Sequence, residues 1–108
     1  EIVEEDFAIG DGIRLEPTPG HTPGHCSVHL ASKGAEAVIT GDMFHHPSQV
    51  VEPGWASRAC WDKAMAVRTR TRFLEKYADT GTRVLGTHFA PPTAIYIEGA
   101  GDGFRVKL

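Results

Sequence analysis

The chain has 108 residues and a net charge of −3, with acidic and basic side chains mixed along it. A chain of this length forms one small domain around a single core. It lacks the basic face that nucleic-acid binding needs, and no apolar run approaches the roughly 20 residues that span a bilayer. We therefore expect neither a nucleic acid nor a membrane as partner.

The ends and the cysteines indicate where the protein works. The acidic start has none of the basic and apolar regions of a signal peptide. Cys26 and Cys60 form no CxxC motif and are too few for a disulfide framework, so we expect reduced, buried thiols in a cytoplasmic protein. Because the chain begins with Glu1 rather than Met, we expect a processed or excised piece.

The apolar pattern predicts several β-strands and one long helix. Gly10-Asp11-Gly12 is a turn signal between two short strands. The predicted strands lie within the ranges 7–16 (a hairpin), 26–30, 37–40, 83–87, 94–98 and 104–108. The last two form a hairpin closed by a glycine-rich turn. The run 37–40 alternates little, which is typical of a strand covered on both faces.

The long helix is predicted from Arg58 to about Thr80. Ser57 is a suitable N-cap, and Gly81 is a suitable stop. Apolar residues recur at three- and four-residue steps; they are Cys60, Ala64, Val67, Thr71, Leu74 and Ala78, widened by Trp61, Met65, Phe73 and Tyr77. The solvated face carries Arg68, Arg70 and Arg72. These arginines lack the aromatic and glycine-rich partners of a phosphate site.

Residues 17–25 form a turn that holds His21 and His25 four residues apart. Its near-repeat of Thr-Pro-Gly-His fixes much of the backbone, because proline restricts φ and glycine permits angles that other residues avoid. A rigid loop loses little conformational entropy on binding, so it can hold an imidazole in place for a metal or a reaction. The alternative is a plain turn between strands with two surface histidines.

Three predicted strands lead to potential metal ligands: His21, Asp42 and His88. In layered α/β folds, sites gather beyond strand ends, where loops converge. Imidazoles with a carboxylate form a ligand set for zinc, iron or manganese, and a carboxylate can bridge two metals. Each residue alone is more often a turn aspartate or a hydrogen-bonded histidine. Those alternatives do not explain three such residues at three strand ends.

Three motifs, in this order, resemble the second half of a metallo-β-lactamase superfamily hydrolase: Thr18-Pro19-Gly20-His21-Thr22-Pro23-Gly24-His25, Thr40-Gly41-Asp42 and Gly86-Thr87-His88. The resemblance covers nearly the whole chain. Residues 41–49 and 87–93 look most like the branch that holds methyl parathion hydrolase-like and lactonase-like enzymes. The implied fold is α/β, half of an αββα sandwich, with one mixed β-sheet, one long helix and a C-terminal β-hairpin.

The resemblance also implies roles for single residues. His21 matches the ligand histidine of the first motif, and His25 matches a supporting histidine. Asp42 matches the aspartate that bridges two metals and holds the hydroxide, so it is the expected catalytic residue. His88 matches the late histidine of the second metal.

The implied chemistry is hydrolysis of a small ester, lactone or phosphotriester by metal-bound hydroxide, with one or two zinc ions as cofactor. The long loop 44–57 is typical of binding loops. Its side chains near the substrate pocket would be Phe44, His45, His46 and Trp55. Packing within the loop is the alternative for these four.

The His-x-His-x-Asp-His motif of the family's first half is absent from the sequence. We therefore expect residues 1–108 to form a single domain that is the C-terminal half of the fold. Its own metal site would be incomplete, because stable zinc sites take three or four protein ligands. Little or no catalysis is expected from this chain alone; the alternatives are a non-catalytic metal-binding module and a purely structural piece.

Half of a sandwich exposes the inner face of its sheet. We expect an apolar patch there, made of Val28, Leu30, Val38, Ile39 and Val84. Soluble monomers rarely expose a large patch of this kind. A homodimer would bury it, with each chain substituting for the missing half of the other.

Overall fold

The computed structural model describes residues 7–108, so the acidic start of the chain lies outside the described residues. Seven strands form one sheet in their order along the chain. They are β1 (Ala8–Gly10), β2 (Ile13–Pro17), β3 (Cys26–Ser32), β4 (Ala35–Ile39), β5 (Arg83–Leu85), β6 (Ala94–Ala100) and β7 (Gly103–Lys107). Neighbours are antiparallel except β4 and β5, which are parallel. The mixed sheet and the C-terminal hairpin confirm the predicted fold class.

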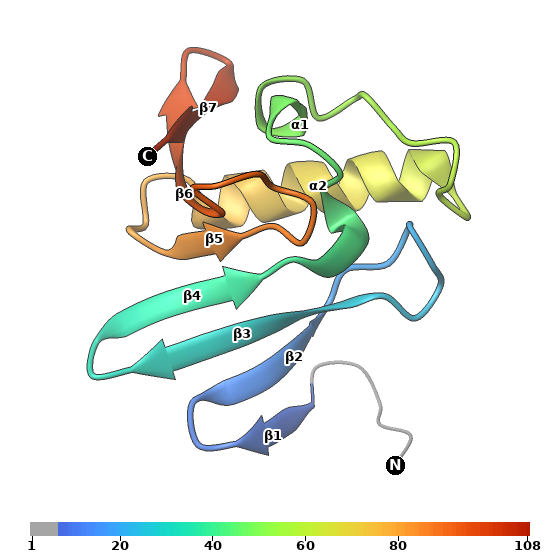
Figure 1. Cartoon of the computed structure of the whole chain (residues 1–108). Helices are drawn as coiled ribbons and strands as arrows, with labels where there is room; N and C mark the ends of the chain where they lie inside the picture. Colours follow the sequence, from blue (N-terminus) through green and yellow to red (C-terminus); the bar gives the residue numbers. More distant parts are fainter. Residues whose placement is uncertain (1–6) are drawn as a thin grey trace.

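The helical segments all lie in the connection between β4 and β5. They are the short 3-10 helix η1 (Gly41–Met43), α1 (Ser48–Val51) and α2 (Lys63–Tyr77). The long helix α2 lies along one side of the sheet, while α1 lies beside the last hairpin (Figure 1). Within residues 7–108, none of the helices combines the length and the apolar character of a membrane-spanning helix.

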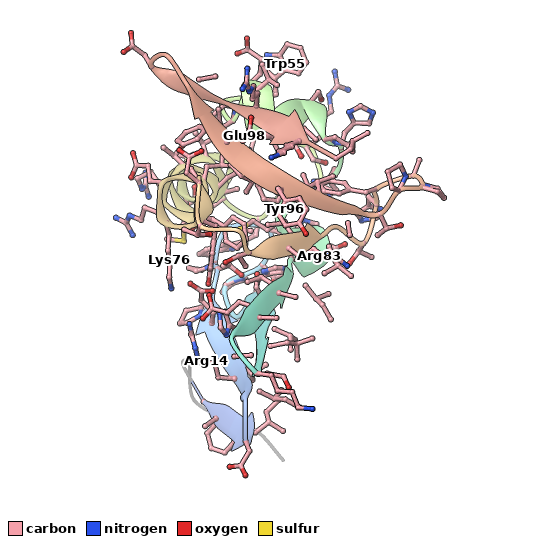
Figure 2. All side chains as sticks on the ribbon, turned by 90° about the vertical axis from the view of Figure 1, so that its left-hand side faces the viewer. Arg14, Trp55, Lys76, Arg83, Tyr96 and Glu98 are labelled. Carbon is pink, nitrogen blue, oxygen red and sulfur yellow. The ribbon has the colours of Figure 1, made fainter. Side chains whose placement is uncertain are left out.

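The core lies between α2 and one face of the sheet, which Figure 2 shows from the side. Its members come from β4, β5 and β6, from α2 and from the loops beyond β4 and β5. They are Val38, Met43, Phe44, Val50, Phe73, Leu74, Tyr77, Val84, Phe89, Ile95 and Ile97. Val38, Val84 and Ile95 are paired directly across three strands. Directly paired residues lie on the same face of a sheet, so all three are buried on the face that α2 covers.

No described helix covers the opposite face of the sheet. We call this surface the open face; its apolar side chains are Ile13, Leu15, Val28, Leu30, Ile39 and Leu85, all at least partly exposed. Strand pairing places them in adjoining rows. The predicted patch is therefore present, but Val38 and Val84 do not belong to it.

The structure corrects the prediction for the strand 37–40. Val38 is fully buried under α2, but the next residue, Ile39, is 38% exposed on the open face. The short run of apolar residues hides an alternation in which each face is apolar. The strand is thus covered on one side only within the described residues.

The long helix is shorter than predicted at both ends. It begins after Asp62, whose side chain accepts a hydrogen bond from the Met65 N–H at 2.9 Å. Ser57 instead accepts from the Ala59 N–H in a local turn. The helix ends at Tyr77, since Asp79 adopts a φ of 59° before the chain reaches Gly81.

The buried stripe of α2 also differs from the predicted one. Its buried residues are Ala66, Arg70, Phe73, Leu74 and Tyr77. Arg70 was expected on the solvated face but is 0% exposed, whereas Arg68 and Arg72 are exposed as predicted. The spacing of apolar residues predicts that a helix forms but not which side of it is buried. Arg70 can be buried because loop carbonyl groups accept hydrogen bonds from its guanidinium.

A polar contact ties the end of β2 to α2. Glu16 pairs with Lys76 and accepts a hydrogen bond from the Tyr77 hydroxyl at 2.6 Å. Burial alone would raise the pKa of Glu16, but these hydrogen bonds outweigh it and lower the pKa. The strand is thus fixed against the helix just before the turn that carries His21.

Candidate metal centre

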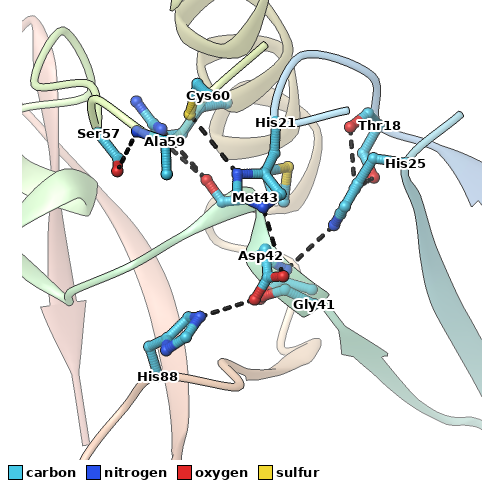
Figure 3. A network of polar contacts seen from close by, with 12 residues as sticks. Thr18, His21, His25, Gly41, Asp42, Met43, Ser57, Ala59, Cys60 and His88 are labelled. Carbon is cyan, nitrogen blue, oxygen red and sulfur yellow. Dashed lines mark hydrogen bonds and ion pairs between the residues drawn. The ribbon is translucent and has the colours of Figure 1, made fainter. Parts of the chain in front are cut away.

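Three loops meet beyond one end of the sheet. His21 follows β2, Asp42 follows β4 and His88 follows β5. β4 and β5 are parallel, and β2 runs in the same direction because β3 is antiparallel to both of its neighbours. All three strands therefore end at the same edge, where their loops bring the side chains together (Figure 3).

Asp42 lies between two imidazoles. Its Oδ1 is 2.7 Å from Nε2 of His88, and its Oδ2 is 3.5 Å from Nε2 of His21. The hydrogen bond to His88 is the main reason that the pKa of Asp42 lies below its usual value, against a smaller opposing effect of burial. The carboxylate is therefore ionised at neutral pH, with one oxygen directed at each histidine.

His25 holds Asp42 from the backbone side. Its Nε2 accepts a hydrogen bond from the Asp42 N–H at 3.0 Å, and its Nδ1 lies 3.0 Å from the Thr18 carbonyl. The ring proton must then be on Nδ1, where it faces that carbonyl. Burial lowers the pKa of His25 and favours this neutral form. Because its Nε2 is engaged, His25 orients Asp42 and does not point a free nitrogen into the centre.

Gly41 allows this close approach. Its φ is +56°, and a Cβ there would lie 2.9 Å from Nε2 of His25. A side chain would therefore force the imidazole away from the backbone of Asp42. The Gly-Asp pair in the sequence has a steric reason in the structure.

His45 lies between the two predicted ligand histidines. Its ring centroid is 5.0 Å from that of His21 and 5.2 Å from that of His88, with which it stacks. Its Nδ1 is buried and has no hydrogen-bond partner among the described residues. Burial, followed by the neighbouring histidines, lowers its pKa, so the ring is neutral near pH 7. Of the four predicted pocket residues, His45 is the one in contact with the ligand histidines.

The other three residues of that loop lie elsewhere. Phe44 is 0% exposed and packs against Phe73 and Phe89 at centroid distances of 5.8 and 6.2 Å, so it belongs to the core and does not line a pocket. His46 is exposed, and its Nδ1 accepts from the Ser48 N–H. Trp55 is 61% exposed (Figure 2). The short helix α1, which the sequence did not predict, lies in the loop between His46 and Trp55.

Helix α2 seats the turn that carries His21. The Thr69 hydroxyl donates to the Pro19 carbonyl at 2.5 Å. Gly20 lies directly on Ala66: a Cβ at Gly20 would be 2.4 Å from the Ala66 Cα. The rigidity of the turn could be predicted from its prolines and glycines, but its contact with a helix more than 40 residues later had no signal in the sequence.

The donor types suit a divalent cation, because two imidazole nitrogens and a carboxylate are common zinc ligands. Within residues 7–108, however, no group of three or more histidine, cysteine, aspartate and glutamate side chains is arranged to hold a metal ion. His21 and His88 instead contact Asp42 directly. The three residues therefore fit part of a metal site, with Asp42 as the shared member, and not a closed one.

Comparison with known proteins places this geometry in context. A model of the metallo-β-lactamase superfamily matches residues 1–102. The structure is similar to the dizinc quorum-quenching lactonase AidC in complex with a product, with a TM-score of 0.88 and 22% identity over 98% of this chain. It is also similar to the hydrolase AbOPH of the β-lactamase superfamily, with a TM-score of 0.86 and 28% identity over 96% of the chain.

A third similar structure is an N-acyl homoserine lactone hydrolase with product bound at its catalytic metal centre. Here the TM-score is 0.72 and the identity 22% over 85% of this chain. The chain spans only 36% of the length of each of these three proteins. A search of curated proteins gave no match.

Proposed function

This chain belongs to the metallo-β-lactamase superfamily, and we propose that it supplies part of the metal site of a hydrolase. The observation that carries the proposal is the Asp42 carboxylate, which directs one oxygen at Nε2 of His21 and the other at Nε2 of His88. A carboxylate in that position is suited to serve two neighbouring metal positions. Lactones are the first substrates we propose, because two similar structures are lactonases; aryl esters and phosphotriesters are the alternatives.

Each residue of the centre has a role in this proposal. His21 and His88 would hold zinc, or iron or manganese, through Nε2, with Asp42 between them. When bound, such a metal lowers the pKa of a coordinated water and polarises the attacked carbonyl. Asp42, ionised at neutral pH, would accept a hydrogen bond from the attacking water and orient it, while His25 fixes the Asp42 backbone. His45, which stays neutral, donates or accepts a hydrogen bond at the substrate without adding charge.

The partial geometry limits what the isolated chain can do. The described residues form no closed metal site, so in this proposal the remaining ligands come from outside them, for example from a further segment of polypeptide or from a second copy of the chain. We therefore propose weak metal binding by these residues alone and catalysis only in the completed assembly.

Zinc binding by variants of this chain tests the proposal. In competition with a chromophoric chelator, we expect His21→Ala and Asp42→Ala to weaken zinc binding by at least about tenfold. His46→Ala is the matched control, because His46 is exposed and its ring is hydrogen-bonded to Ser48 and not to the centre within the described residues. A wild-type chain that binds no zinc, or variants that bind as well as wild type, would leave only a structural role.

Hydrolysis assays separate a catalytic from a non-catalytic metal module. The substrates are an N-acyl homoserine lactone, an aryl ester and a phosphotriester, each with zinc present. Lactone hydrolysis that Asp42→Ala abolishes would support a site completed by self-association. Zinc binding without turnover of any of the three would rule out a site completed by self-association, and would leave the non-catalytic module and a site completed by a further segment of polypeptide.

The open face favours self-association as the second part of the proposal. Its apolar side chains lie in adjoining rows, and Ile13 and Ile39 are 39% and 38% exposed. A surface of this kind on a soluble protein is commonly covered by a partner. We propose that a second copy of the chain packs on it.

Ile39→Lys is expected to convert a dimer into a monomer in light-scattering chromatography, because the charge would be buried at the centre of the contact. Val51→Lys is the control: Val51 is 54% exposed but lies on α1, away from the open face. A wild-type protein that stays monomeric over a wide range of concentrations would rule out the homodimer.

A further inference from the structure

Cys60 is the side chain that contacts the far edge of the His21 ring. Its Sγ lies 3.8 Å from Nδ1 of His21, while Nε2 of the same ring faces Oδ2 of Asp42 at 3.5 Å (Figure 3). The two nitrogens of His21 thus have different partners on opposite edges. In a metal-binding histidine, the partner of the non-ligating nitrogen fixes both the orientation and the tautomer of the ring.

The backbone sets the position of this sulfur. The N–H of Trp61 donates to the His21 carbonyl at 2.9 Å, and the N–H of Asp62 donates to the Gly20 carbonyl at 3.0 Å. Asp62 also caps α2, so the connection is anchored to the helix. The backbone of residues 61 and 62 is therefore hydrogen-bonded to the turn, which fixes the position of the neighbouring Cys60. Cys60 itself is 9% exposed, which limits the access of water to the contact.

We propose that Cys60 is a positioning residue for His21: it holds Nδ1 and thereby aims Nε2 at Asp42 and at the metal that the two would share. This inference rests on the proposed function for its metal-binding part. Cys60 touches neither substrate nor metal in this arrangement. It acts only through the His21 ring.

A thiol suits this role because sulfur is both a weak donor and a weak acceptor. If the ring proton of His21 lies on Nε2 and faces the Asp42 carboxylate, the Cys60 S–H can donate to Nδ1. If Nε2 held a metal, the ring proton would lie on Nδ1, and the Nδ1–H would donate to sulfur. The contact at Nδ1 thus survives the change of tautomer, so metal entry leaves no buried ring nitrogen unpaired.

NMR of the metal-free protein tests the orientation directly. Long-range ¹H–¹⁵N spectra report the tautomer of each histidine. In Cys60→Ala, Nδ1 of His21 loses its partner while Asp42 still faces Nε2, so we expect the Nδ1 signal to move away from its wild-type position. Cys60→Ser should keep the wild-type pattern, because a hydroxyl also donates and accepts.

Ser57→Ala is the matched control. It removes a hydroxyl from the same connection, and among the described residues this hydroxyl accepts from the Ala59 N–H and does not contact His21. Unchanged His21 signals in Cys60→Ala would overturn the proposal. If Cys60→Ala does not fold, Cys60→Val fills the space without a polar group and carries the same expectation.

Zinc affinity is the second measurement. Cys60→Ala is expected to bind zinc about 10- to 100-fold more weakly than wild type, and Cys60→Ser within a few-fold of it. Equal affinity of Cys60→Ala and wild type would refute the positioning role and leave the metal-site proposal intact. If no protein binds zinc but the Nδ1 signal of His21 moves as expected, Cys60 orients His21 and the proposed metal function is wrong.

Discussion

Arg70→Leu is expected to lower the free energy of unfolding by about 3 to 5 kcal/mol, because it removes a buried side chain that donates to several loop carbonyl groups. One of these carbonyls, that of Trp55, keeps a second donor in Gln49 Nε2 at 2.7 Å. The Arg70 guanidinium is 0% exposed. Its Nε and Nη2 donate to the Met43 carbonyl, both at 3.2 Å, and its Nη1 donates to the carbonyls of Pro53 and Trp55 at 2.6 and 3.0 Å. The Phe44 ring packs against the guanidinium, whose Cζ lies 5.8 Å from the ring centroid.

Urea unfolding of three variants tests this role. Arg68→Leu, on the exposed side of the same helix, should stay near wild type. Arg70→Lys should lose an intermediate amount, because an ammonium keeps the charge but lacks the planar fork of donors. Arg70→Leu with wild-type stability would mean that the loop carbonyls find other donors.

The effect of Arg70 should extend to the metal centre. The three carbonyls that it binds lie at the end of η1 (Met43) and beyond α1 (Pro53 and Trp55). The segment between them carries His45, which lies next to His21 and His88. Loss of the guanidinium therefore frees the segment that places His45. A protein with Arg70→Lys that still folds is expected to bind zinc more weakly than Arg68→Leu.

The three strand-end residues could be predicted because the information is local. Each follows a strand by a few residues, and strand direction alone brings the ends of β2, β4 and β5 to one edge. The family resemblance implied a supporting role for His25, but not its partner. The bond goes to the backbone N–H of Asp42, and every non-proline residue possesses such a group.

The buried side of α2 and the partner of His21 could not be predicted either, because both depend on contacts between distant segments that leave no local pattern in the sequence. Arg70 is stabilised in the core by carbonyl oxygens, which leave no trace in the sequence pattern. Cys60 was assigned to the helix stripe, but Asp62 is the better cap and leaves residues 60–62 free to pair with the turn. Contacts between segments 39 positions apart are set by packing and not by local propensity.

The alternation of polar and apolar residues in β3 did not predict which face of the strand is buried. It divides Val28 and Leu30 from Ser27 and His29, but the polar pair faces α2 and is buried, while the apolar pair lies on the open face. A pattern of period two defines two faces and does not say which one the chain itself covers. The open face is thus apolar and uncovered within the described residues, as expected of a sheet on which a further layer packs.

Gly20→Ala is expected to destabilise the protein by about 2 to 6 kcal/mol, the sum of backbone strain and overpacking. Gly20 has a φ of +141°, which disfavours any side chain. A Cβ would lie 2.4 Å from the Cα and 2.5 Å from the N of Ala66, and neither backbone atom can swing away. Ala66→Gly should therefore not rescue the variant, since it removes only the contact at 2.9 Å with the Ala66 Cβ.

Gly24→Ala in the same turn is the control. Nothing lies within 4 Å of a Cβ at Gly24, so this variant should match wild type or be slightly more stable, because alanine narrows the unfolded ensemble. Urea unfolding and zinc binding of both variants measure the difference. If Gly20→Ala were as stable as Gly24→Ala, the turn would not be seated on α2. His21 would then lose its fixed direction toward Asp42, and the proposed centre would lack the ligand that the turn is built to hold.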